Sequence, residues 1–570
     1  MQWQLYEQNP QQHKLLLEGL DVSPVTASVL INRGIKTREE AEKFLNPSLQ
    51  HMHDPFLFLD MDKAVYRIIK AIKNKEQITI CGDYDADGVC STALLIVFFK
   101  MVGVDVDYYI PHRINDGYGL NCPAVESLKN KGTNLIITVD NGISTINAIG
   151  LANKLGVDVI VTDHHEPPEK LPDALAIINP KRKGCGFPFK ELAGVGIAFN
   201  LAIALRQRLR ENDFFGDIDE PKLKHLLEIV AIGTIADVAP LLDENRVFVK
   251  FGLEELKKSS NCGLSALKAI SGLEPQHINS TTIAFRLAPR INAAGRVDDH
   301  SLGVDLLTTD SPENATELAQ KMQNANVRRQ SIEGKILTEA ENLIKSDAKY
   351  NDYLGLVLAK EGWHQGVIGI VANRISDAHK KPTVIIGIEN GVGRGSIRSV
   401  GNFNVMEVLN QCSDLLTRFG GHKHAAGITI EEKNIDAFEK RFNKIVSAAL
   451  KDRDRIDSIM VDAEINPEMI TESLMSELEL MEPFGEGNPE PIFSTKDLKV
   501  SMSRIIKEKH LKLKFTENMI TLDAIGFGMA KHNILKDDVL DVAFIPQRDT
   551  WRGNGAIQLK LKDLNRKRVH

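Results

Sequence analysis

The sequence predicts an α/β protein of several domains, with a first domain on a parallel sheet, a long connecting helix, a second α/β domain and a C-terminal β-barrel. Three observations predict this class. The 570 residues are 43% hydrophobic, which is enough for three or four cores at about 150 residues per domain. Two regions alternate β-rich runs with helical patterns of ten or more residues, as βαβ units do. From about residue 456, short strands alternate with turns, as in a small closed β-unit.

Residues 1–55 are predicted to form a helical lead-in without chemistry of its own, with helices at 25–33 and 38–45. The first α/β domain is predicted over residues 56–305. Its strands are expected at 77–81, 104–110, 134–139 and 158–162, and its helices at 65–72, 89–101, 146–155 and 223–238.

A connecting helix is predicted over residues 306–348. It opens on the start signal Ser311-Pro312-Glu313, and its apolar residues keep helical spacing as far as Leu343. We expect a rigid strut that holds two domains at a fixed separation. The second α/β domain follows over residues 349–450, with strands at 353–359, 382–388 and 393–399 and a helix at 367–379.

The C-terminal β-domain is predicted over residues 456–570, with the Gly- and Pro-rich joint PFGEGNPEPIF (483–493) ahead of most of its strands. From residue 496 to the end there are 16 Lys and Arg against 9 Asp and Glu, although the whole chain carries a net charge of −7. A basic segment of this kind can follow a phosphate backbone. The alternative is a solvated basic surface without a ligand.

Composition argues against several other classes of protein. The longest apolar run has about seven residues, whereas a membrane-spanning helix needs about 20. The polar N-terminus lacks the apolar core of a signal peptide. The six cysteines include no CxxC pair, which argues against a disulfide framework and a zinc knuckle. We therefore expect a cytoplasmic protein with reduced cysteines.

Acidic residues and histidines gather where the predicted strands end. In a parallel sheet the carboxyl ends of the strands converge on one edge, where ligands bind. Taken alone, an Asp at such a place is more often a helix cap or a turn residue. Together, uncompensated carboxylates would raise one another's pKa and destabilise the fold unless cations lie among them. The set comprises Asp83, Asp85, Asp87, Asp140, Asp163, His164, His165 and, reached from a helix, Asp237.

Carboxylate oxygens with one or two imidazoles suit Mg²⁺ or Mn²⁺ better than zinc. With five or six protein ligands available, two ions are expected rather than one. A pair of divalent ions about 3.5–4 Å apart is the usual arrangement for in-line attack on phosphorus. The sequence thus predicts metal-dependent chemistry on a phosphate ester.

The segments DYDADG, VDNGIS, TDHHEP and GTIADVAPL occur in the order of the four motifs of the DHH phosphoesterase superfamily, which is named after the triplet seen here at 163–165. Within it the chain resembles the bacterial RecJ family, exonucleases that degrade single-stranded DNA from its 5′ end to 5′-mononucleotides in DNA repair and recombination. The resemblance runs from about residue 45 to the C-terminus. It includes PRINAAGR (289–296), GWHQGVIGIVANRI (362–375), GRGSIRS (393–399) and FGGHKHAAG (419–427).

The resemblance implies that Asp85 and Asp140 hold one metal ion and that Asp140 bridges to a second. The implied ligands of the second ion are Asp87, Asp140, His164 and Asp237. Asp83, Asp163 and His165 would complete or orient the set, and His165 would also face the scissile phosphate. The expected catalytic residues are Asp140, His164, His165 and Asp163.

One position departs from the superfamily. Several members have a histidine four residues before the first ligating Asp, where this chain has Cys81. The first ion would then bind less tightly, use Asp83 or water instead, or arrive with the substrate.

The second α/β domain, DHHA1-type by the resemblance, is predicted to hold the end of the substrate. Arg394, Ser396 and Arg398 alternate on a strand, so all three can face one phosphate. Gly420 and Gly421 allow close approach of backbone amides, and the helix after GWHQG offers free N–H groups. The alternative is a Gly-rich hairpin with ordinary surface arginines.

The resemblance adds further contacts to the 5′ end and its phosphates from Arg113 and from either Arg290 or Arg296. For Tyr118, base stacking and phosphate contact are both open. His422 and His424 either contact phosphate or pack, and Trp363 and His364 either line the DNA path or belong to the core.

The basic β-domain resembles the oligonucleotide-binding (OB) fold of the family and would guide the strand. The candidate track residues are Lys507, Lys509, Lys512 and Lys514. By the same resemblance the expected partners are single-stranded DNA, the single-stranded-DNA-binding protein and a RecQ-type helicase, and the protein is expected to be a monomer.

Two other functions are considered. One is a DHH phosphoesterase acting on short oligoribonucleotides or cyclic dinucleotides, but such proteins are usually shorter and lack the basic β-domain. The other is a non-catalytic scaffold of replication helicases, whose relatives have lost the metal-binding carboxylates that all four motifs keep here.

Overall fold

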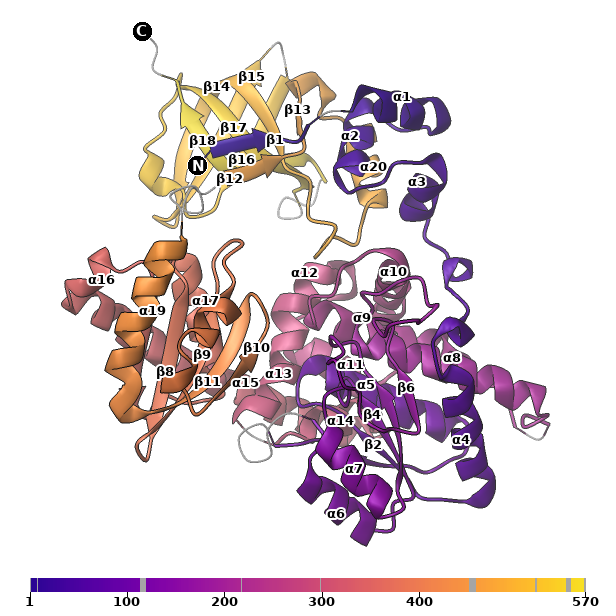
Figure 1. Cartoon of the computed structure of the whole chain (residues 1–570). Helices are drawn as coiled ribbons and strands as arrows, with labels where there is room; N and C mark the ends of the chain where they lie inside the picture. The colour runs from indigo at the N-terminus through magenta and orange to yellow at the C-terminus, as the bar shows by residue number, and fades with distance from the viewer. Residues whose placement is uncertain are drawn as a thin grey trace. The chain divides into compact units, whose positions relative to one another are not determined.

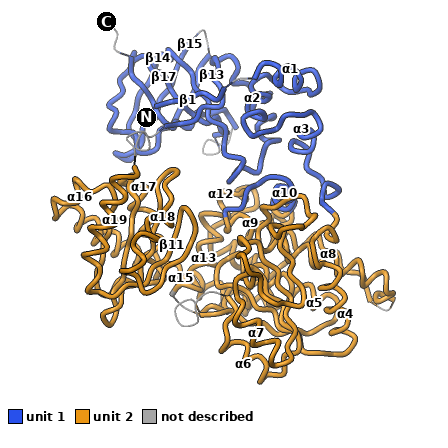
Figure 2. Tube along the Cα trace, viewed as in Figure 1, with its two compact units in different colours: residues 1–53, 238–251, 457–570 blue, residues 54–237, 252–456 orange. Residues whose placement is uncertain are grey.

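The computed structural model describes residues 2–7, 9–112, 119–216, 218–297, 299–450, 458–517, 520–549 and 555–567. These residues divide into two compact units (Figure 2). One consists of residues 54–237 and 252–456, and the other of residues 1–53, 238–251 and 457–570. Among the described residues, no helix is long and apolar enough to span a membrane.

The larger unit contains the expected parallel sheet, with strand order β3-β2-β4-β5-β6 (Figure 1). Helices α6 and α7 pack on one face through a core that includes Ile136, Val159 and Val161. Helices α4, α5 and α8 contact the strands as well. The elements are α4 (Met61–Asn74), β2 (Ile78–Cys81), α5 (Ala86–Met101), β3 (Asp107–Tyr109), α6 (Cys122–Asn130), β4 (Leu135–Val139), α7 (Ile146–Lys154), β5 (Asp158–Thr162), β6 (Ala176–Ile178) and α8 (Gly194–Glu211).

A group of helices follows this sheet along the chain. The helix predicted at 223–238 is a 3₁₀ turn (Leu223–Leu226) followed by α9 (Leu227–Ala236), which stops where Val238 adopts a φ of 59°. The other members are α10 (Asp243–Lys257), α11 (Cys262–Ile270), α12 (Ser280–Thr282), a π-helical turn (Ile283–Leu287), α13 (Ala288–Val297) and α14 (Leu302–Thr308).

The connecting helix is confirmed as α15 (Pro312–Ser346), a single 35-residue helix that begins at the predicted signal, where the Ser311 side chain accepts from Asn314 N. Its second half packs on the next domain. Glu333 Oε1 forms an ion pair with Nε of Arg374 at 2.7 Å, and Glu339 accepts from Trp363 Nε1 at 2.8 Å. The strut is therefore fixed to that domain by buried and half-buried polar contacts as well as by apolar packing.

The second α/β part is a mixed sheet of order β10-β11-β9-β8-β7, in which only β7 and β8 are parallel. Its core lies between the sheet and α18 and α19. The elements are α16 (Lys349–Asp352), β7 (Leu356–Glu361), α17 (Ile368–His379), β8 (Thr383–Glu389), β9 (Val392–Arg398), α18 (Val405–Asn410), β10 (Arg418–Gly421), β11 (Ala425–Glu431) and α19 (Ile435–Ala449).

The smaller unit joins both ends of the chain. Strands β14, β15, β16, β18 and β17 close into a barrel because β14 also pairs with β17. Its elements are β1 (Gln2–Leu5), α1 (Pro10–Gly19), α2 (Pro24–Asn32), α3 (Arg38–Leu45), β12 (Ser458–Val461), β13 (Ala463–Glu464), α20 (Glu472–Leu480), β14 (Phe493–Ile506), β15 (His510–Glu517), β16 (Ile520–Gly526), β17 (Val539–Arg548) and β18 (Ile557–Arg566).

The N-terminal segment is more than a lead-in, because it shares a hydrophobic core with this barrel. Val29 and Leu30 of α2 belong to the same buried cluster as Phe493 and Leu513. Strand β1, which the sequence pattern did not indicate, pairs with β12 in parallel. The fully buried Arg246 guanidinium donates to backbone oxygens on both sides, among them Phe44 O and Met481 O.

Candidate functional site

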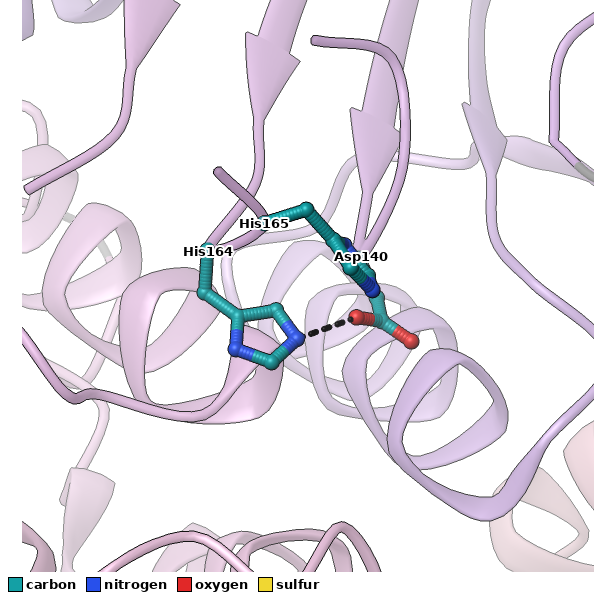
Figure 3. Close-up of side chains that lie close together, drawn as sticks. All are labelled: Asp140, His164 and His165. Atoms are coloured by element: carbon teal, nitrogen blue, oxygen red, sulfur yellow. Dashed lines mark ion pairs between the residues drawn. The ribbon is translucent and has the colours of Figure 1, made fainter. Parts of the chain in front are cut away.

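The predicted acidic and histidine residues do gather at one edge of the parallel sheet. The turn between β2 and α5 carries Asp83 and Asp85, and Asp87 lies in the first turn of α5, whereas Asp140 follows β4. The DHH triplet follows β5, and Asp237 caps the C-terminus of α9. Figure 3 shows Asp140 with the two histidines, and a dashed line joins His164 to Asp140.

Ligand atoms from these residues approach one another closely enough to share ions. Nε2 of His164 lies 3.1 Å from Oδ1 of Asp140, and its Nδ1 lies 3.8 Å from Oδ2 of Asp237. Three groups each offer ligand atoms within 4.8 Å of one another. They are Asp83 with Asp85 and Asp140, Asp87 with His164 and Asp237, and Asp140 with His164 and His165.

The start of helix α8 holds Asp87 in place. Gly194 N and Val195 N donate to its two carboxylate oxygens at 2.7 and 2.8 Å, so the positive end of the helix faces the cluster. A Cβ on Gly194 would lie only 2.8 Å from Cβ of Asp140. Residue 194 must therefore be glycine for α8 to approach the carboxylates this closely.

Asp140 is positioned by the loop after β4. It has a φ of 60°, in the left-handed region that Asp tolerates better than most residues. The buried Asn141 next to it donates to Cys81 O and Val139 O and so ties this loop to β2. The VDNG motif thus brings the carboxylate of one strand end to the carboxylates of the neighbouring one.

Asp163 and His165 form a separate pair. Asp163 accepts from Nδ1 of His165 at 2.7 Å and from Ile143 N at 2.9 Å, so it orients the ring. Burial opposes a charge on His165, but the hydrogen bond to Asp163 and the charges of Asp163, Asp237 and Asp85 together outweigh it and raise the pKa of His165 to about 9. His165 is therefore an imidazolium at neutral pH.

The electrostatics of the remaining cluster fit divalent cations. Burial and the Asp85 carboxylate raise the pKa of Asp87 to about 7, and burial with neighbouring carboxylates raises the pKa of Asp140 and of Asp237 well above their usual range. Burial lowers the pKa of His164 to about 4, so its imidazole is neutral and able to ligate. A mostly oxygen donor set with one neutral imidazole suits Mn²⁺ or Mg²⁺.

Cys81 does not join the cluster. Its side chain is buried in the core under α6 and α7, burial raises the pKa of its thiol, and no metal-capable group among the described residues includes it. Asp83 belongs to a metal-capable group instead, together with Asp85 and Asp140.

The predicted end-binding residues lie on one face of β9. Arg394, Ser396 and Arg398 alternate with the buried Gly395 and Ile397. Arg398 Nη1 donates to Ser396 Oγ at 3.1 Å. A Cβ added to Gly369, in the first turn of α17, would lie 3.1 Å from Ser396 Oγ. The N-terminus of a twelve-residue helix and this Ser–Arg pair are thus side by side.

Glycines leave room on the same face of the sheet. Ser396 pairs with Gly427, which pairs in turn with Gly420. No atom lies within 4 Å of a Cβ built on Gly420. Gly421 has a φ of 150°, and His422 and His424 are exposed in the hairpin turn. The two histidines therefore have no part in the core.

The structure separates several residues that the sequence left open. Trp363 is buried and donates to Glu339, so it belongs to the core. Arg290 donates to Gln323 on α15, whereas Arg296 donates to Gly366 O in the loop before α17. Of these two arginines, Arg296 therefore reaches toward the end-binding site. Arg113 and Tyr118 lie outside the described residues.

The four lysines of the barrel fall into two pairs. Lys512 and Lys514 alternate on β15 with the buried Leu511 and Leu513, opposite Arg504 and Met502 of β14. By contrast, Lys507 has a φ of 49° and, like Lys509, lies in the turn between the two strands.

Sequence reasoning missed two contributors to the site. One is Gly194, which a glycine-rich helix start (Gly194-Val195-Gly196) could have indicated. The other is Asn292, whose Oδ1 accepts from Ala86 N at 2.9 Å between the metal-cluster aspartates. This asparagine lies within the PRINAAGR segment, but neither periodicity nor composition distinguishes it from its neighbours there.

Comparison with known proteins agrees with this arrangement. Residues 77–234 match the DHH family N-terminal domain, residues 351–448 match the DHHA1 domain, and residues 461–563 match the RecJ OB domain.

The single-stranded-DNA-specific exonuclease RecJ of Bacillus subtilis (strain 168) is 38% identical over 569 residues, covering 99% of this chain and 70% of that protein. The RecJ exonuclease of Escherichia coli (strain K12) is 35% identical over 555 residues, covering 95% and 92%. The structure of RecJ from Thermus thermophilus in complex with Mn²⁺ superposes with a TM-score of 0.85 at 30% identity, covering 100% of this chain and 80% of that one. The Mg²⁺ complex from the same organism gives a TM-score of 0.79 at 29% identity, covering 100% and 79%.

Proposed function

The chain belongs to the RecJ family of single-stranded-DNA-specific exonucleases of the DHH superfamily, and from this premise we propose that it removes nucleotides one at a time from the 5′ end of single-stranded DNA. By its family, its place is in DNA repair and recombination. The observation that carries the proposal is the gathering of five carboxylates and a neutral imidazole at the edge of one sheet.

The cluster binds Mn²⁺ or Mg²⁺, and two ions would supply charge neutralisation and an activated water for attack on phosphorus. We assign Asp83, Asp85 and Asp140 to one ion and Asp87, Asp140, His164 and Asp237 to the other. At the first of these sites the chain has Cys81 where several superfamily members have a histidine. The first site therefore lacks an imidazole ligand, and it would bind its ion more weakly than the second.

The hydrolysis forms a bond between a water oxygen and the phosphorus of the first internal phosphodiester. The bond from that phosphorus to O3′ of the terminal nucleotide breaks, and O3′ leaves with a proton. His165, held as an imidazolium by Asp163, faces the same cluster and would stabilise the charge of the phosphate or supply that proton. The shortened strand keeps the phosphate at its new 5′ end and can enter the same site again.

The 5′-phosphate would be bound by Ser396, Arg398 and the N-terminus of α17, with Arg296 beside them and Arg394, Gly420, Gly421 and His422 along the same hairpins. Arg113, Tyr118 and Arg290 would contact the strand further along. The barrel face with Lys512 and Lys514 would guide the incoming strand by its charge.

We propose five segments. They are an N-terminal segment (1–55), the DHH catalytic domain (56–305), the connecting helix (306–348), the DHHA1-type domain (349–450) and the OB-like β-domain (456–570). Binding of the single-stranded-DNA-binding protein and of a RecQ-type helicase, a monomeric state and a cytoplasmic location are proposed from the family resemblance. The non-catalytic alternative is disfavoured because all four motifs contribute ligand atoms to one cluster.

The deciding experiment is digestion of single-stranded DNA labelled at the 5′ or the 3′ end, with Mn²⁺, Mg²⁺ or EDTA. The expected result is immediate release of the 5′ label as a mononucleotide, gradual shortening of the 3′-labelled strand and no cleavage with EDTA. Release of the 3′ label first would overturn the polarity, and digestion of dinucleotides alone would overturn the substrate class.

A further inference from the structure

Helix α13 contacts both the metal-binding turn and the end-binding domain within five residues. On one side Asn292 Oδ1 accepts from Ala86 N at 2.9 Å, and Ala86 lies between Asp85 and Asp87. The same turn packs directly on the helix, because a Cβ built on Gly295 would lie 2.5 Å from Tyr84 O. Backbone therefore meets backbone, without a side chain that could adjust between them.

On its other side, α13 meets the loop before α17 in the same manner. Arg296 Nη1 donates to Gly366 O at 3.0 Å, and a Cβ on Gly366 would lie 2.6 Å from Arg296 O. Three residues further along, Gly369 packs against the end-binding pair. A Cβ built on Gly369 would lie 3.1 Å from Ser396 Oγ and 3.4 Å from Arg398 Nη2. The end-binding pair and the metal-cluster aspartates are thus joined through one continuous set of close contacts.

Close-packed contacts of this kind transmit a shift instead of absorbing it. A misplacement of about 1 Å at a reacting centre can cost about 100-fold in rate, so the separation of the two sites matters for cleavage. We propose that α13 is the spacer that sets which phosphodiester reaches the metal cluster, and that Asn292 is a positioning residue for single-nucleotide release. This inference rests on the proposed function and deepens it.

The test compares Asn292→Ala and Gly366→Ala with Asn279→Ala. Asn279 is a matched control because its side chain only caps α12, accepting from Thr282 N at 2.8 Å. The measurements are the length of the labelled product from 5′-phosphorylated single-stranded DNA, and the ratio of cleavage rates for 5′-phosphate and 5′-hydroxyl substrates. Folding is checked by Mn²⁺-dependent thermal stabilisation.

The expected result is mononucleotides alone from the wild type and Asn279→Ala, and an added fraction of di- and trinucleotides from the other two variants. The preference of these two variants for 5′-phosphorylated DNA should fall about tenfold, since the 5′-phosphate site at Ser396 and Arg398 is no longer aligned with the metal cluster. If both variants fold but keep the wild-type product length and 5′-phosphate preference, the inference is overturned alone. If the wild type releases no terminal nucleotides, the proposed function fails as well.

Discussion

Nε2 of His164 lies 3.1 Å from Oδ1 of Asp140, so two atoms that are both able to bind cations face each other at the edge of the sheet (Figure 3). The low pKa of His164 leaves the ring neutral at neutral pH, and Asp140 is surrounded by other carboxylates that raise its own pKa. Divalent ions would stabilise this arrangement, because ligation of an ion offsets the electrostatic repulsion between the carboxylates.

Replacing Asp140 by Asn should lower the rate of DNA cleavage by about 1,000-fold or more, because the residue contributes to two of the three ligand groups. In EDTA the variant should melt no lower than the wild type, since one charge leaves a crowded cluster. In Mn²⁺ it should lose the stabilisation that the wild type gains. These results are checked by a nuclease assay and thermal denaturation, with the exposed Asp105→Asn as the control. Equal Mn²⁺ stabilisation of both variants would contradict the assignment.

Replacing Ser396 or Arg398 by Ala should weaken recognition of the 5′-phosphate. A charge-assisted hydrogen bond contributes about 1.5–3 kcal/mol, so the preference for 5′-phosphate over 5′-hydroxyl DNA should fall about ten- to 100-fold. Arg418→Ala, on the edge strand of the same sheet, is the matched control. Steady-state rates on both substrates measure the effect. A loss of activity that is the same for the two substrates would mean that these residues do not bind the terminal phosphate.

Replacing both Lys512 and Lys514 by Ala should reduce the salt dependence of DNA binding. Each lost phosphate contact lowers the slope of log K against log salt by about 0.7 for single strands, so the slope should shrink by about 1.4. A double variant of Lys496 and Lys567 serves as the control, because those lysines lie outside β15 and are paired with Glu464 and Asp497, whereas the ion pair of Lys514 with Asp523 is long at 4.0 Å. Fluorescence anisotropy over a range of salt concentrations tests this. Equal slopes for the two double variants would exclude β15 as the DNA track.

Glu228 should make the stability of the protein fall with rising pH. Burial raises its pKa to about 7 from 4.5, partly offset by Ser259 and Lys268. Between about pH 4.5 and 7 the unfolded state therefore loses the proton while the folded state keeps it, and the free energy of unfolding decreases by up to about 3 kcal/mol.

Glu228→Gln should remove this decrease. The free energy of unfolding of the variant, relative to that of the wild type, should therefore be higher at pH 8 than at pH 4.5. Urea denaturation at several pH values measures the difference. The exposed Glu254→Gln, which removes only a pair with Lys257, should follow the wild type. An equal change in stability at both pH values would contradict a raised pKa.

The metal cluster could be predicted from the sequence because its placement depends on local patterns. Short apolar runs marked the strands, and a parallel sheet brings all their carboxyl ends to one edge. The alternation of Arg394, Ser396 and Arg398 likewise follows from the period of a strand. The assignments that resemblance alone supplied, such as the role of Arg113, have no equivalent physical derivation.

The contacts that join distant segments could not be predicted. The pairing of β1 with β12 depends on a four-residue strand and a partner more than 450 positions away. Asn292 has no periodic or compositional signal, since its role arises from where α13 lies beside Ala86. Trp363 is buried in a cluster that includes Ile336 of α15, and its Nε1 donates to Glu339 of the same helix, which no pattern around residue 363 indicates.

The shared core of the two chain ends has a consequence for synthesis on the ribosome. Residues 1–53 are made about 400 residues before their partners at 457–570. At about 5–20 residues per second this interval lasts roughly 20–80 s. During that time the apolar side of α2, with Val25, Val29 and Leu30, has no barrel to cover it, so the nascent chain should depend on chaperones until the barrel strands have been made.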